Sequence, residues 1–233
     1  MNTSQPCLIL MLKYPDPGLV KTRLGREIGF ENSARVYRLL VAGVMRVLRG
    51  LEHPVLICCD PVRSFEAYRK WLGKEHGFFL QQGKDLGERM HAAFRQAFEH
   101  GYPGAVLLGS DISGLERDIV EQALAWLQQQ RPVLGPAEDG GYYMLGLERT
   151  DLDYSFFSHI PWSTSRVLEM TVQRMKKKGL TPCMMPQLRD VDTLEDLCML
   201  FPGFSGGYPD EPGSREWFIE ACMISLQKVL LQR

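Results

Sequence analysis

Short apolar runs alternate along this chain with longer segments of helical periodicity, and this alternation limits the fold more than any other feature. Strands are predicted at residues 7–12, 54–59, 78–81, 105–108 and 132–135. Helices are predicted between them at residues 32–49, 65–74, 86–100 and 115–130. Strand–helix alternation of this kind favours an α/β fold, in which a mainly parallel sheet carries helices on both faces.

The second half of the chain departs from strict alternation. The aromatic segment 142–147 is predicted as a strand that breaks the pattern. Further elements are a helix at 163–178, a strand at 180–185, a short helix at 193–200, a Pro/Gly-rich linker at 202–213 and a helix at 215–231. We expect one domain at 1–202, and an appendage at 203–233 that packs either on this domain or on a partner subunit of a homodimer.

Composition excludes several classes of partner. Lys and Arg number 27 against 28 Asp and Glu, so a net charge of -1 gives no general attraction to nucleic acid. No apolar run approaches the ~20 residues that span a bilayer, which argues against a membrane partner. Six cysteines without a C-x-x-C pair are typical of reduced thiols, so a cytoplasmic protein is expected.

Ligands of open α/β sheets bind beyond the carboxyl ends of the strands, and basic residues follow the first predicted strand there. They are Lys13, then Lys21 and Arg23 after the Gly18 turn. Between a glycine loop and a helix, Lys21 and Arg23 can neutralise a diphosphate while backbone N–H groups bind it. The alternative is that these are solvated surface charges.

A carboxylate follows the strand at 105–108. Asp111 comes directly after Gly109-Ser110. Mg²⁺ and Mn²⁺ prefer oxygen ligands, usually one or two carboxylates together with substrate phosphates, so Asp111 is a candidate metal ligand. The alternative is that Asp111 or Ser113 caps the next helix.

Two further acidic segments are candidates for the substrate side. In Glu138-Asp139-Gly140-Gly141 the glycines permit close approach of the backbone to a ligand, although a plain tight turn has the same sequence. Asp190 and Asp192 occupy alternate positions of an extended segment, so they can share a metal or a hydroxyl-bearing substrate. Asp192 can equally cap the helix that starts near Thr193.

Taken together, these motifs resemble a known family. They are Lys13-x-Pro15-x-Pro17-Gly18-x-Val20-Lys21-Thr22-Arg23-Leu24, Asp85-Leu86-Gly87-x-Arg89-Met90, Gly109-Ser110-Asp111, Gly135-Pro136-Ala137-x-Asp139-Gly140-Gly141-Tyr142-Tyr143, Pro161-Trp162-Ser163-Thr164 and Asp190-Val191-Asp192-Thr193. The chain resembles, over roughly residues 7–200, the bacterial nucleotide-diphospho-sugar transferase-like family once classed as a domain of unknown function. Some members are labelled arsenosugar-biosynthesis glycosyltransferases.

The resemblance implies a single GT-A-like domain, related to the guanylyltransferases of molybdenum-cofactor and deazaflavin-cofactor synthesis. It implies Mg²⁺ or Mn²⁺ on Asp111, with Asp192 as a second ligand. The implied phosphate and nucleotide residues are Lys13, Gly18, Lys21, Arg23, Asp85, Gly87 and Ser110. The implied acceptor side is Asp139, Gly140, Gly141, Tyr142 and Asp190.

The sequence departs from the family at one position. The family usually has proline two residues after the acid, where this chain has Ser113. A missing proline predicts a freer loop with the carboxylate retained.

The expected activity is transfer of a sugar from a nucleotide-diphospho-sugar to a small acceptor. Asp111 and Asp139 are the candidate catalytic residues, and Asp139 would activate the acceptor. A nucleotidylyltransferase that moves a nucleotide from a nucleoside triphosphate to a phosphorylated small molecule is the alternative. A non-catalytic nucleotide-binding module is the third.

Overall fold

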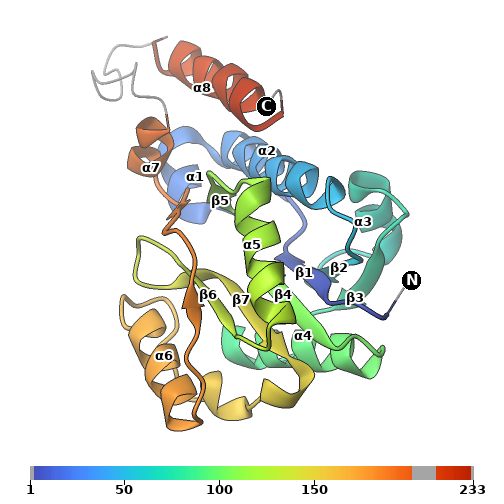
Figure 1. Cartoon of the computed structure of the whole chain (residues 1–233). Helices are drawn as coiled ribbons and strands as arrows, with labels where there is room; N and C mark the ends of the chain where they lie inside the picture. Colours follow the sequence, from blue (N-terminus) through green and yellow to red (C-terminus); the bar gives the residue numbers. More distant parts are fainter. Residues whose placement is uncertain (1–2, 201–213, 232–233) are drawn as a thin grey trace.

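A seven-stranded mixed sheet forms the centre of the protein. The computed structural model describes residues 3–200 and 214–231, drawn in Figure 1. The strands are β1 (Cys7–Leu12), β2 (Val55–Cys59), β3 (Gly77–Leu80), β4 (Gly104–Leu108), β6 (Val133–Pro136), β7 (Tyr142–Glu148) and β8 (Cys183–Met184), in the order β3-β2-β1-β4-β7-β6-β8. β7 alone runs antiparallel to its neighbours, β4 and β6. The predicted α/β class and the strand that breaks the alternation are both confirmed.

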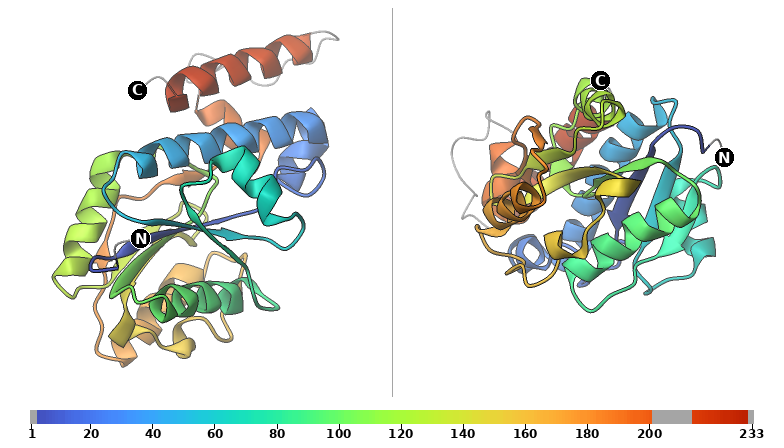
Figure 2. Two further views of the ribbon diagram at one scale, coloured as in Figure 1. Left: turned by 90° about the vertical axis from the view of Figure 1, so that its right-hand side faces the viewer. Right: turned by 60° about the horizontal axis from the view of Figure 1, so that its bottom comes forward.

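Helices cover both faces of this sheet, as predicted. The helices of the described residues are α1 (Thr22–Ile28), α2 (Phe30–Arg49), α3 (Phe65–Leu72), α4 (Leu86–Glu99), α5 (Arg117–Gln128), α6 (Val167–Lys177), α7 (Leu194–Met199) and α8 (Ser214–Leu231), with 3₁₀ turns at Arg149–Asp151 and Tyr154–Phe156. In β1, Leu8 and Leu10 face the core under α2, α3 and α5, whereas Ile9 faces the core under α4 and α6. Figure 2 shows α2 and α4 on opposite sides of the sheet. A strand buried on both faces is apolar throughout, which explains the unbroken apolar runs.

Two predicted helices have different bounds in the structure. The helix expected at 32–49 begins at Phe30, and Gly29, with φ 87°, separates it from the shorter α1 that was not predicted. The helix expected at 163–178 begins only at Val167, because Ser163 has φ 64° and the residues before α6 form a turn. A left-handed residue cannot continue a right-handed helix.

A second, two-stranded sheet was not predicted from the sequence. β5 (Ile112–Ser113) pairs antiparallel with β9 (Arg189–Asp190). The Ser113 hydroxyl donates to the Arg189 carbonyl at 3.0 Å, and the Val191 N–H donates to the Asp111 carbonyl. The expectation of a freer loop at Ser113 is therefore wrong, since this serine ties the Asp111 loop to the Asp190 segment.

The C-terminal helix α8 packs on the rest of the chain. Ile219, Cys222 and Met223 share a buried cluster with residues of α1, α2 and α7, and Figure 1 shows α8 lying across α2. The helix therefore packs on its own chain, one of the two arrangements expected for it. The predicted linker at 202–213 lies outside the described residues, and the domain boundary there stays a prediction. No helix in the described part of the chain is long and apolar enough to cross a membrane.

Candidate functional site

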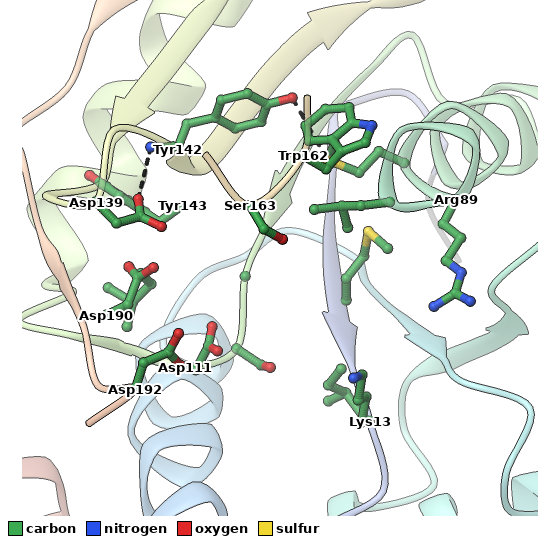
Figure 3. A pocket seen from close by; sticks show the side chains of 18 of the residues that line it. Lys13, Arg89, Asp111, Asp139, Tyr142, Tyr143, Trp162, Ser163, Asp190 and Asp192 are labelled. Atoms are coloured by element: carbon green, nitrogen blue, oxygen red, sulfur yellow. Dashed lines mark hydrogen bonds between the residues drawn. The ribbon is translucent and has the colours of Figure 1, made fainter. Parts of the chain in front are cut away.

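A cavity of about 760 Å³ opens at the carboxyl ends of β1 and β4. Figure 3 shows the side chains that surround it. Of the predicted site residues, the cavity is lined by Lys13, Lys21, Arg23, Asp85, Ser110, Asp111, Asp139, Gly141, Tyr142, Asp190 and Asp192. Gly18, Gly87 and Gly140 are not among its lining residues. The structure thus brings together groups from five separate sequence segments.

Lys21 joins two of these acids in one ion-paired cluster. Its Nζ lies 2.6 Å from Asp111 Oδ2 and 2.7 Å from Asp192 Oδ1. The lysine side chain is only 3% exposed, whereas the two carboxylates are 39% and 46% exposed and remain open to the cavity. A buried ammonium needs such partners, because an unpaired buried charge is strongly unfavourable. Asp111 and Asp192 can therefore share a single cation.

The pKa values of this cluster follow from the pairing. Burial alone would lower the pKa of Lys21, but Asp111 and Asp192 outweigh burial and raise it. Burial would likewise raise the pKa of Asp111, but the charge and hydrogen bond of Lys21 hold it below its usual range. Both partners are thus fully charged at neutral pH.

The backbone conformation of the β1–α1 loop directs the Lys21 side chain toward Asp111 and Asp192. Lys21 is the N-cap residue of α1 and has the left-handed conformation φ 46°, ψ 49°. Gly18 earlier in the loop has φ 80°, and nothing lies within 4 Å of a Cβ added there. Gly18 therefore serves the turn of the loop. The Leu24 N–H donates to the Asp192 carbonyl, which fixes α1 beside the Asp192 segment.

The structure overturns the capping alternatives for Asp111, Ser113 and Asp192. The N-cap residue of α5 is Glu116. Thr193 caps α7 in a reciprocal capping box with Asp196. Because other residues occupy both cap positions, the Asp111 and Asp192 side chains are left to face Lys21 and the cavity.

Asp139 and Asp190 lie on the same flank of the cavity as Asp111 and Asp192 (Figure 3). Asp139 Oδ1 accepts a hydrogen bond from the Gly141 N–H at 2.8 Å, so Asp139 does form the tight turn that its sequence allows. Asp190 Oδ1 is buried and has no hydrogen-bond partner in the described part of the chain. Burial, together with the negative charges of Asp111 and Asp139, raises the pKa of Asp190 to about 7. Asp190 is therefore partly protonated at neutral pH.

Tyr37 of α2 is a site residue that the sequence reasoning missed. Its hydroxyl lies 2.9 Å from Ser110 Oγ and accepts a hydrogen bond from the Lys13 N–H at 3.0 Å. The residue thus fixes the ends of β1 and β4 relative to each other. Its only sequence signal is an aromatic position on the buried face of a helix, which is usually a core position.

Further basic, polar and aromatic groups line the cavity. They are Gln81, Lys84, Arg89, Trp162, Ser163 and Thr164, to which the sequence patterns assigned no role. Asp85 caps α4 by accepting from the Glu88 N–H. Gly87 is buried, and a Cβ there would lie 2.4 Å from the Phe157 carbonyl oxygen and 2.7 Å from the Trp162 ring. Gly87 therefore permits close packing of α4 against the Trp162 segment.

Comparisons with known proteins agree with this architecture. A protein from Desulfovibrio desulfuricans G20, described as a "putative nucleotide-diphospho-sugar transferase", is 35% identical, with 95% of this chain and 97% of that chain covered and a TM-score of 0.83. The inositol-1-phosphate CTP transferase from T. maritima is 11% identical, with 97% and 98% covered and a TM-score of 0.54. A CMP:2-keto-3-deoxy-manno-octonic acid synthetase complexed with CTP is 11% identical, with 87% and 99% covered and a TM-score of 0.52.

The last two likenesses show a shared fold. No curated protein sequence matches this chain significantly. A family model described as "Uncharacterized protein conserved in bacteria (DUF2064)" matches residues 44–164, slightly more than half of the chain. The chain is therefore a member of the DUF2064 family and has the nucleotide-diphospho-sugar transferase fold.

Proposed function

We propose that this protein is a metal-dependent transferase that takes a sugar from a nucleotide-diphospho-sugar and passes it to a small acceptor. The observation that carries the proposal is the convergence of Asp111 and Asp192 on one cation at the carboxyl edge of the sheet, inside a 760 Å³ cavity. The description of the 35% identical Desulfovibrio protein supports the same class of donor.

The donor atoms of the site fit Mg²⁺ or Mn²⁺. These hard cations take oxygen ligands and commonly use one or two carboxylates plus phosphate oxygens and water. Asp111 and Asp192 already contact a single cationic atom, Lys21 Nζ. Within residues 3–200 and 214–231, no group of three or more His, Cys, Asp or Glu side chains is arranged to hold a metal by itself. A metal held by Asp111 and Asp192 would thus depend on substrate phosphates for further ligands.

Basic residues at the end of β1 can stabilise the departing nucleotide. Lys13 and Lys21 line the cavity from the β1–α1 loop and Arg23 from the first turn of α1, and Lys21 stays protonated because its pKa is raised. A bound divalent cation supplies further neutralisation of phosphate charge. Fixed charges of this kind lower the barrier when negative charge grows on the leaving group.

The acceptor would react on the Asp139 side. The bond from the anomeric carbon to the β-phosphate oxygen breaks, and its electron pair stays on that oxygen. An acceptor oxygen bonds to the carbon, and its proton passes to the Asp139 carboxylate. Asp139 uses Oδ1 for the Gly141 N–H, so Oδ2 is the oxygen proposed to take the proton.

One observation favours nucleotidyl transfer as the second candidate. Three basic side chains, Lys13 and Lys21 of the β1–α1 loop and Arg23 of α1, carry enough charge for a triphosphate. In that reaction a phosphate of the acceptor attacks the α-phosphate of a nucleoside triphosphate, and pyrophosphate leaves. Lys21 would then neutralise pyrophosphate in place of a nucleoside diphosphate.

A thermal-shift screen tests these functions. Nucleoside triphosphates and nucleotide-diphospho-sugars are each added with and without Mn²⁺, since a ligand at 100 times its Kd adds about 2.7 kcal/mol of stability. We expect metal-dependent shifts with sugar nucleotides. Shifts confined to triphosphates would favour nucleotidyl transfer, and shifts that do not depend on metal would contradict the proposed metal site.

We also infer that the partners are small molecules and that the protein works in the cytoplasm. All six cysteines carry free thiols, which suits a reducing compartment. The balanced charge of -1 supports the absence of a nucleic-acid partner.

A further inference from the structure

Ser163 has a strained backbone at the edge of the cavity. It lines the cavity and has φ 64°, in the left-handed region that side-chain-bearing residues seldom adopt. Two hydrogen bonds hold the turn that contains Ser163. The Trp162 N–H donates to the Ile160 carbonyl, and the Thr164 hydroxyl donates to the Pro161 carbonyl at 2.7 Å. Strain that the surroundings hold in place is found most often at functional sites.

Two glycines fix this turn to the rest of the site. A Cβ at Gly140 would lie 2.4 Å from the Ser165 carbonyl oxygen, so the turn sits directly on the Gly140 backbone. A Cβ at Gly87 would lie 2.7 Å from the Trp162 ring, so α4 holds the indole from the other side. Because both glycines permit contacts that no other residue would allow, Trp162 and Ser163 have a fixed position in the cavity wall.

The side chains at this position have unused hydrogen-bonding capacity. The Ser163 hydroxyl is exposed and has no hydrogen-bond partner among the residues that the structure describes. In Figure 3 it points into the cavity, which Asp139 also lines. Trp162 lies beside it, and its ring centroid is 6.4 Å from that of Tyr142. A hydroxyl, a carboxylate and aromatic rings thus surround one part of the cavity.

We propose that Ser163 and Trp162 recognise the sugar ring of the nucleotide-diphospho-sugar. This inference rests on the proposed function and names two residues that would select the transferred group. Sugar hydroxyls both donate and accept hydrogen bonds, so they can pair with Ser163 and Asp139 together. The C–H face of a sugar ring is apolar and packs well against an aromatic side chain. A diphosphate held at Asp111 and Asp192 would place its sugar in the same cavity that Trp162 and Ser163 line.

The test compares each nucleotide with its sugar derivative in the presence of Mn²⁺. Isothermal titration with UDP and UDP-glucose, and with GDP and GDP-mannose, gives the affinity contributed by the sugar alone. The variants are Ser163→Gly, Ser163→Ala and Trp162→Phe. Ser165→Ala is the matched control, since Ser165 lies in the same turn, is exposed and does not line the cavity.

We expect each Ser163 variant to bind the sugar nucleotide about tenfold more weakly, the effect of one lost hydrogen bond, with unchanged affinity for the free diphosphate. Ser163→Gly also relieves the positive φ, so its Tm should rise by about 2 °C and exclude misfolding as the cause. Trp162→Phe should likewise weaken only the sugar nucleotide.

Equal affinities of wild type and the Ser163 variants for the sugar nucleotide would overturn this inference while leaving the proposed function intact. Equal losses for diphosphate and sugar nucleotide would overturn it as well, because they would place Ser163 at the phosphates. If neither ligand binds the wild-type protein with Mn²⁺, the proposed function fails and this inference fails with it.

Discussion

The four acids around the cavity fall into two pairs that differ in their ion pairing. Asp111 and Asp192 share the buried Lys21, and the pKa of Asp111 is lowered. Asp139 and Asp190 form no ion pair in the described part of the chain, and the pKa of Asp190 is raised to about 7. Lys21 therefore pairs with only two of the four acids, whereas burial and the neighbouring negative charges favour the protonated form of Asp190.

Of the substitutions that distinguish the two pairs of acids, Asp111→Asn is expected to have the largest effect on nucleotide affinity. Loss of this carboxylate removes one of two protein ligands from the proposed metal site, so Mn²⁺-dependent nucleotide affinity should fall by about 100-fold, or about 2.7 kcal/mol. Isothermal titration with and without Mn²⁺ measures it. Asp118→Asn, an exposed acid in the first turn of α5, is the control. Unchanged affinity for the Asp111 variant would remove the metal assignment.

Lys21→Met should act on the two ligand classes in opposite directions. Lys21 Nζ competes with a metal ion for Asp111 and Asp192, so its removal should tighten Mn²⁺ binding without nucleotide by about tenfold. Nucleotide affinity should fall, because a phosphate-binding charge is lost. Manganese titration followed by electron paramagnetic resonance measures the first effect.

Lys84→Met is the matched control for that variant, since Lys84 is exposed and lines the cavity without an ion pair to either acid. Weaker Mn²⁺ binding in Lys21→Met than in the control would show that Lys21 supports the metal site by holding the acids in place.

Asp190→Asn should change the pH dependence of stability. The unfolded carboxyl titrates near pH 4 and the folded one near pH 7, so the folded state binds the extra proton between these values and stability falls as pH rises. Asparagine does not titrate, so the Asp190→Asn variant does not lose this stability as the pH rises. After allowance for solvent screening, the variant should gain about 1–2 kcal/mol at pH 8 relative to pH 5, measured by urea unfolding in the absence of metal.

Urea unfolding of Asp139→Asn at the same two pH values compares Asp139 with Asp190, the two acids that form no ion pair in the described part of the chain. An equal pH-dependent gain in Asp139→Asn would indicate that the raised pKa belongs to the pair and not to Asp190.

Ser113→Ala should have the smallest effect. The Ser113 hydroxyl bond to the Arg189 carbonyl joins the Asp111 loop to β9, and one such bond contributes about 1 kcal/mol. Urea unfolding should detect this loss, with nucleotide affinity only slightly reduced. A large loss of nucleotide affinity without loss of stability would mean that this contact positions Asp111 for binding.

The sequence predicted which residues line the cavity better than it predicted the contacts between them. Apolar runs mark where β1 and β4 end, so Lys13 and Asp111 could be placed at the cavity from local patterns alone. The Lys21 ion pairs depend on a left-handed backbone angle and on contacts across 90 and 171 residues, which no local pattern contains. The Ser163 turn was hidden inside a segment of helical periodicity.

The most direct test of the account follows the products of the reaction by phosphorus NMR. The protein is incubated with Mn²⁺, the sugar nucleotide that stabilises it most, and glycerol or water as acceptor. We predict that nucleoside diphosphate accumulates, that its formation requires Mn²⁺, and that Asp111→Asn forms none. Release of pyrophosphate from a nucleoside triphosphate and a sugar phosphate, with the sugar nucleotide left intact, would contradict the account.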